Sequence, residues 1–135
     1  MPAPHALKTC PCGHPRPYAD CCGRLHQAFA QGQGLSATTP EALMRSRYSA
    51  FVLDLRDYLL ASWHASTRPA ALEPPEPGLK WLGLEVRHAA MQDADHGTVD
   101  FVARSKLDGR AHRLQERSRF VREGGAWYYL DGELS

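Results

Sequence analysis

The four cysteines of this sequence are the side chains whose type and spacing could most directly do chemistry. They lie close together, as Cys10, Cys12, Cys21 and Cys22, and the 135-residue chain contains no other cysteine. Thiolates are preferred ligands of Zn²⁺, and four of them surround it as a closed tetrahedron with Zn–S bonds of about 2.3 Å. A disulfide framework usually spreads its cysteines along the chain instead. The cluster therefore predicts one structural Zn²⁺.

The spacing lets two pairs of sulfurs face one point. The first pair flanks Pro11 in a tight turn, and the second pair stands where the chain could turn into a helix. The loop between them contains Gly13 and two prolines, which favour a chain that folds back. Two alternatives stay open: a pair of disulfides, and replacement of one thiolate by His26, although four cysteines already complete the tetrahedron.

Residues 24–64 have the pattern of helices. Thr39 before Pro40 is typical of a helix start, because threonine caps the first turn and proline costs nothing at the first helical position. Asp54 and Asp57 interrupt the apolar spacing that follows, which predicts two helices with a bend between these residues. The proline-rich segment 66–78 is a connector. The apolar stripe consists of Met44, Tyr48, Phe51, Val52 and Leu55.

Residues 80–131 alternate between apolar and polar side chains, which is typical of strands with one buried face. Leu82, Leu84 and Val86 share one such face. Turns are predicted at Asp108-Gly109, at Gly124-Gly125 and, with a weaker signal, at Asp95-His96-Gly97. Four strands with short turns form an antiparallel meander. Helices followed by a sheet predict an α+β domain.

The cysteine segment carries a resemblance to a known motif, and the rest of the chain to a known family. The string Cys10, Pro11, Cys12, Gly13, Tyr18, Cys21 and Cys22 resembles the SEC-C motif, the zinc-binding module at the C-terminus of the SecA translocation ATPase. The segments TPEALMRSRYSAFV (39–52), DYLLASWH (57–64), WLGLEV (81–86), ERSRF (116–120) and WYYLDG (127–132) resemble the uncharacterised YchJ family of bacterial proteins.

The resemblance implies a fold and a kind of partner. It implies an NTF2-like cone in residues 27–135, in which N-terminal helices pack on a curved antiparallel sheet. A small SEC-C-like zinc-binding motif in residues 1–26 precedes the cone. A motif of this kind implies a protein partner, as in SecA-type proteins. His14 and Pro15 depart from the Ser and Gly that SEC-C motifs usually carry there, and the second, C-terminal SEC-C motif of many family members is absent from these residues.

A cone of this fold often encloses a ligand, so the side chains on its inner face are candidates for a pocket. On the third strand, alternation places Glu116 on the same face as Leu114 and Phe120, where a carboxylate needs a partner or a raised pKa. Arg45 or Arg47 would pair with it in a structural salt bridge; the alternative is a general base that acts on a small molecule. The candidate pocket residues are Arg45, Arg47, Tyr48, His112, Glu116, Ser118, Trp127 and Tyr129.

Composition and charge exclude several classes of protein. Hydrophobic residues make up 43% and charged residues 23%, as in a globular domain. The net charge of +1 does not favour binding to nucleic acid. Nucleic-acid binding through a basic strip on the outer sheet face is the weakest of the alternative functions. We expect a cytoplasmic protein, since no stretch resembles a signal peptide or membrane span. No catalytic motif is present, so no catalytic residue is assigned. The strip comprises Arg104, Lys106, Arg113, Arg117 and Arg119.

Overall fold

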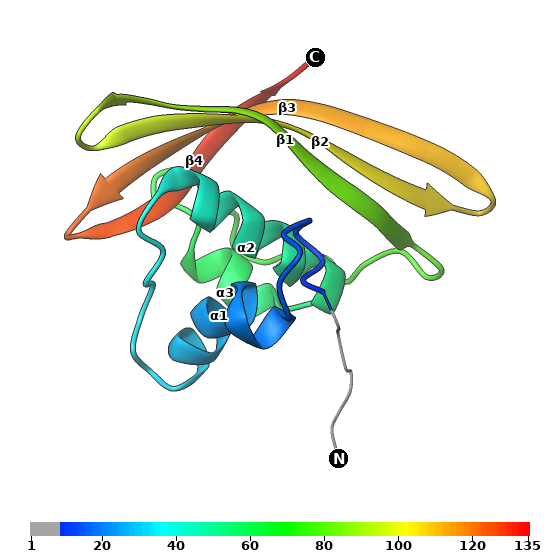
Figure 1. Ribbon diagram of the computed structural model, residues 1–135, viewed down its shortest axis with the longest axis horizontal. Coiled ribbons are helices and arrows are strands. Elements are labelled where there is room, and N and C mark those ends of the chain that lie inside the picture. Colours follow the sequence, from blue (N-terminus) through cyan, green and yellow to red (C-terminus); the bar gives the residue numbers. More distant parts are fainter. Residues whose placement is uncertain (1–8) are drawn as a thin grey trace.

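The structure, a computed structural model, describes residues 9–135, in which three α-helices precede one antiparallel sheet and α2 lies between the sheet and the other two helices (Figure 1). A short 3-10 turn, η1, precedes the helices. The elements are η1 (Tyr18–Asp20), α1 (Cys22–Ala30), α2 (Pro40–Leu53), α3 (Arg56–Ala61), β1 (Lys80–Asp93), β2 (His96–Leu107), β3 (Arg110–Glu123) and β4 (Ala126–Leu134). The predicted α+β order is confirmed. Of the predicted zinc segment 1–26, residues 1–8 lie outside the described residues.

Helix α2 begins and ends where the sequence predicts. The Thr39 hydroxyl accepts a hydrogen bond of 3.0 Å from the backbone N–H of Ala42, and Pro40 is the first helical residue. Asp54 then takes a left-handed conformation (φ 58°), which ends α2, and α3 starts two residues later. The predicted bend between two helices is therefore confirmed.

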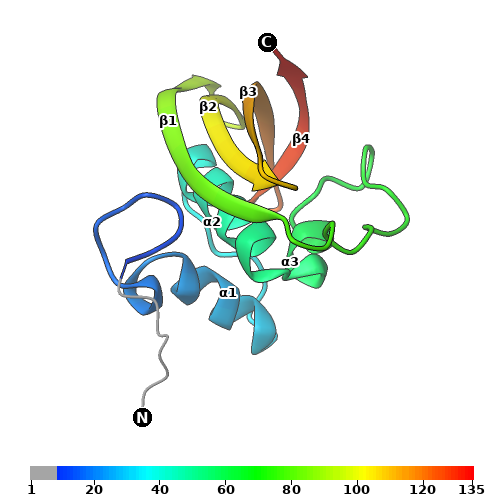
Figure 2. The same cartoon turned by 90° about the vertical axis from the view of Figure 1, so that its right-hand side faces the viewer.

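The four strands form a meander in the order β1-β2-β3-β4, and the sheet arches over α2 (Figures 1 and 2). The turns at Asp108-Gly109 and Gly124-Gly125 form as predicted. The first turn falls at residues 94–95 instead, and His96 already pairs with Asp93 in the ladder. In the described residues no helix combines the length and the apolar character that crossing a membrane requires.

The core lies between α2 and the concave face of the sheet. Leu43, Met44 and Tyr48 of α2 pack against buried side chains of the strands. The predicted inward position of Leu82 is wrong: a register shift between Trp81 and Gly83 turns Trp81 to the core and leaves Leu82 exposed. The strand side chains of the core are Val99, Phe101, Ala103, Phe120 and Trp127.

Candidate metal centre and cavity

The four cysteine sulfurs lie within 4.8 Å of one another, in the segment 9–23 that we call the knuckle. The Sγ atoms of Cys12 and Cys21 are 3.6 Å apart, close to the edge of about 3.8 Å that a tetrahedron with Zn–S bonds of 2.3 Å has. Cys10, Cys12 and Cys22 are buried and Cys21 is half-buried. All four are free thiols, so the structure does not contain the alternative pair of disulfides. The donor set fits one tetrahedral metal ion.

The thiols influence one another's ionisation strongly. Hydrogen bonds from Cys12 and Cys22 lower the pKa of Cys10. Because Cys12 serves Cys10 as a donor, the pKa of Cys12 rises to about 11, and that of Cys22 is raised for the same reason. Arg16 contributes a positive charge, with its Nη2 3.8 Å from the Sγ of Cys21. Ionisation of one thiol thus disfavours ionisation of its neighbours, and all four can be thiolates together only around a bound cation.

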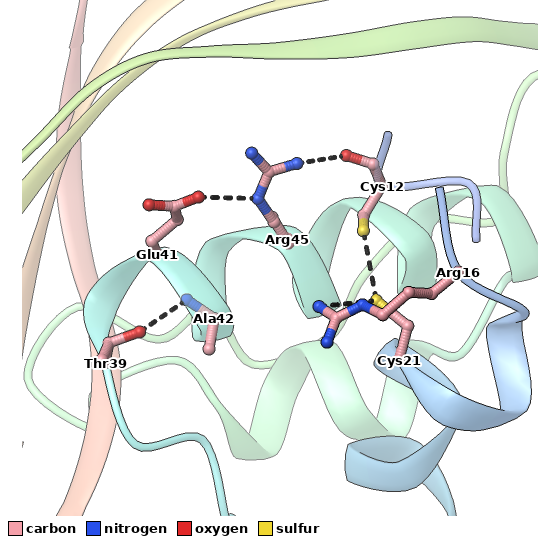
Figure 3. Close-up of polar contacts among 7 residues, drawn as sticks. All are labelled: Cys12, Arg16, Cys21, Thr39, Glu41, Ala42 and Arg45. Carbon is pink, nitrogen blue, oxygen red and sulfur yellow. Dashed lines mark hydrogen bonds and ion pairs between the residues drawn. The ribbon is translucent and has the colours of Figure 1, made fainter. Parts of the chain in front are cut away.

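The knuckle rests on α2 through polar contacts (Figure 3). Arg45 donates from Nη1 to the carbonyl oxygen of Cys12 at 2.7 Å and from Nε to Glu41 at 2.9 Å. The Sγ of Cys10 lies 3.6 Å from the hydroxyl of Ser49. The predicted pair between Arg45 and Glu116 does not form, because Arg45 is committed to the knuckle.

His26 ties α1 to α2 and does not join the cysteines. Its Nε2 donates to the carbonyl oxygen of Ser46 at 2.8 Å, and its Nδ1 accepts from the hydroxyl of Tyr18 at 2.5 Å. Burial lowers the pKa of His26, in keeping with a neutral ring that donates from one nitrogen and accepts at the other. Both ring nitrogens are engaged, so His26 is a structural tie between the helices.

A cavity of about 590 Å³ is lined by residues of α2, the sheet and Trp63. Arg45 lies outside it, and Trp127 is a core residue that does not line it. His112 lines the cavity wall but is exposed to solvent. Trp81 and Trp63 also line it, although neither was among the predicted pocket residues. Trp81 lies beside a register shift and Trp63 lies outside the helices and strands, so no alternation pattern places either on the inner face. The predicted pocket residues on the wall are Arg47, Tyr48, His112, Glu116, Ser118 and Tyr129.

Glu116 is half-buried in this wall and has hydroxyl partners. Its Oε2 accepts from the Ser118 hydroxyl at 2.5 Å and from the Tyr129 hydroxyl at 3.3 Å. No ion pair within 4.0 Å joins Glu116 to a cation in residues 9–135. The side chain lies against Gly132, where a Cβ would clash with it. The carboxylate is held by neutral groups across two strands.

Arg47 is the buried cation of the cavity, with 6% of its surface exposed. Its Nη1 donates to the carbonyl oxygen of Leu59 at 2.8 Å and to the Ser62 hydroxyl at 2.7 Å. The guanidinium carbon lies 4.6 Å from the ring centre of Tyr129 and 5.2 Å from that of Trp63. Burial lowers the pKa of Arg47 to about 10, so the side chain stays charged at neutral pH.

Much of the basic strip on the outer sheet face is paired with acids. Arg117 contacts Asp100 at 2.8 Å, and Arg119 forms a close pair with Asp131. Arg104 lies 3.6 Å from Glu85 on the neighbouring strand. These cross-strand pairs balance the positive charge locally, as on a solvated sheet face.

Comparison with known proteins identifies the family of this chain. Residues 39–132 match the family model described as the middle NTF2-like domain of YchJ. A UPF0225 protein of Methylibium petroleiphilum is 64% identical over 132 residues, which cover 98% of this chain and 93% of that protein. A UPF0225 protein of Bordetella parapertussis is 55% identical over 131 residues, with 97% and 96% covered.

Two solved structures are similar along nearly the whole chain. The solution structure of a SEC-C motif containing protein from Rhodopseudomonas palustris has a TM-score of 0.77 and 32% identity, and covers 94% of this chain and 98% of its own. The crystal structure of a SEC-C motif containing protein from Psychrobacter arcticus has a TM-score of 0.77 and 28% identity, with 96% and 84% covered. The NTF2-like cone is thereby confirmed; the domain boundary at residues 26 and 27 stays a prediction.

Replacing His26 by leucine should weaken the domain without emptying the metal site. His26→Leu removes the hydrogen-bond partner of the buried Ser46 carbonyl and of the half-buried Tyr18 hydroxyl, so we expect the free energy of unfolding to fall by about 2 kcal/mol. Folding lowers the pKa of His26, so its contribution is complete above the unfolded pKa of 6.5 and lost as the pH falls below that value. The gap between wild type and variant should therefore narrow on going from pH 7 to pH 5.

Denaturant titrations with metal analysis measure both quantities. The exposed His88 provides the matched control, and His88→Leu should change the unfolding free energy by less than about 0.5 kcal/mol. Equal losses in the two variants, or a gap that widens at low pH, would contradict the role given to His26.

Glu116→Gln should cost only about 1 kcal/mol of stability, because the amide oxygen can still accept from the two hydroxyls and no cation within 4.0 Å loses an ion pair, the charge of Glu116 acting on Arg47 only from farther away. Glu116→Ala, which removes the acceptor, should cost more. Thermal and denaturant unfolding measure the series. A loss of about 3 kcal/mol or more for the glutamine variant is what a buried ion pair would give, and would show that Glu116 neutralises a cation.

Proposed function

The chain belongs to the YchJ family of proteins with an NTF2-like domain, and we propose that its four cysteines bind one Zn²⁺ that fastens the knuckle to helix α2. The observation that carries this proposal is the convergence of all four sulfurs within 4.8 Å. Four thiolates at tetrahedral spacing favour Zn²⁺ over the hard cations, which prefer oxygen ligands. The SEC-C motif named in the two similar structures supports the same reading.

The zinc would be structural in this arrangement. Four cysteine ligands complete the tetrahedron and leave no position for water or substrate, which catalytic zinc sites keep open. Apart from the cysteines, the apolar neighbours that pack against the cluster from residues 9–135 are Tyr18 and Leu84. So small an apolar contact cannot offset the entropy of ordering the knuckle, and the metal would supply that free energy.

The ordered knuckle would serve as a surface for a protein partner. Residues 15–17 are exposed on its outer side, while its inner side faces α2 and β1 (Figure 2). Two prolines keep this short loop stiff, so a partner would meet a shape that exists before contact. Binding of such a partner would require the metal-loaded protein.

Metal analysis of protein produced with zinc available tests the proposal. We expect one zinc per chain in the wild type and a loss of at least half in Cys12→Ser, because Cys12 is the fully buried ligand. Ser49→Ala is the matched control: it removes the hydroxyl beside Cys10 but keeps all four ligands, and it should retain one equivalent. Well under one equivalent in the wild type, iron in place of zinc, or two disulfides by mass would contradict it.

A further inference from the structure

The guanidinium of Arg47 presents an unused edge to the cavity. Both of its side-chain hydrogen bonds within residues 9–135, to the Leu59 carbonyl and the Ser62 hydroxyl, come from Nη1. In the described part of the chain, Nε and Nη2 have no acceptor and no carboxylate lies within 4.0 Å. A buried cation without a counter-charge is expensive, and the free edge of an arginine has the geometry that holds a carboxylate with two parallel bonds.

A second donor beside Arg47 also lacks an acceptor. The indole N–H of Trp63 is buried without a hydrogen-bond partner among residues 9–135. Trp63 lines the same cavity, and its ring lies beside the guanidinium. Buried donors are nearly always satisfied in folded proteins. The free edge of Arg47, which lines the cavity, therefore indicates a ligand that brings acceptor atoms, and the unmet Trp63 donor lies beside that guanidinium.

The other walls define the body of that ligand. They are largely apolar and aromatic, and the volume of about 590 Å³ suits a small organic molecule. The one acidic side chain among the described residues that line the wall, Glu116, is already held by Ser118 and Tyr129, and it would repel a second anionic group. The apolar wall consists of Met44, Tyr48, Phe51, Trp81, Phe101 and Phe120.

We propose that the cavity binds a small organic monocarboxylate with an aromatic or alkyl body. Its carboxylate accepts from Nε and Nη2 of Arg47, and its body lies along the aromatic wall. Arg47 is the residue that selects acids over neutral molecules, because among residues 9–135 it is the buried cation on the wall, whereas Arg113 also lines the cavity but is exposed. This site is separate from the metal centre, since none of the four cysteines lines it.

Tryptophan fluorescence tests the proposal directly, because Trp63 and Trp81 line the cavity. The metal-loaded full chain is titrated at pH 7.5 with phenylacetate and octanoate, and with the matching neutral amides phenylacetamide and octanamide. We expect at least one acid to bind at least tenfold more tightly than its amide. If each acid binds no more tightly than its amide, or if neither acid binds, the cavity is not a carboxylate site and the proposal is overturned.

Variants locate the binding. Arg47→Lys keeps the charge but loses the two-pronged edge, and should weaken the acid at least tenfold while changing the amide little. Arg117→Lys, on the outer sheet face, is the matched control and should bind as the wild type. If Arg47→Lys does not fold, Arg47→Gln removes the charge and the two-pronged edge but keeps an amide donor for Leu59 or Ser62, and should weaken the acid at least tenfold. Unchanged acid binding in whichever of these two variants folds would overturn the proposal.

Discussion

Helix α2 is buried between the knuckle and the sheet, so its polar side chains must find partners on every side. Ser46, Arg47 and Ser49 are all buried, and each has at least one. The Ser46 hydroxyl lies 2.7 Å from that of Tyr58, and Arg47 and Ser49 reach α3 and Cys10 respectively. A buried polar group without a partner costs about 1–3 kcal/mol. These contacts therefore fix where α1, α3 and the knuckle can lie.

The same helix separates the two candidate sites. Arg45 and Arg47 are two residues apart, which turns their side chains about 200° from one another around a helix with 3.6 residues per turn. Arg45 consequently holds the Cys12 carbonyl, while Arg47 enters the cavity. The cysteine cluster and the cavity therefore contact different sides of α2.

The sequence predicts local features well because neighbouring residues determine them. The cysteine cluster, the Thr39 cap and two of the three turns depend on short spacings, and the structure contains all of them. Features set by distant residues were not accessible. Both Arg45 and Arg47 lie near the apolar stripe, and only the packing of α3 shows which one turns inward. Likewise, the bulge that exposes Leu82 depends on pairing with β2, and no local pattern reports it.

Hydrogen exchange followed by mass spectrometry tests most directly whether the metal centre and α2 form one cooperative unit. The wild-type chain is compared in its metal-loaded and chelated forms. If the knuckle and α2 depend on each other, chelation speeds exchange in residues 40–53 as well as in residues 9–30, while β2 and β3 keep their protection. Faster exchange confined to residues 9–23, with α2 unchanged, would contradict this account and would make the knuckle an independent appendage.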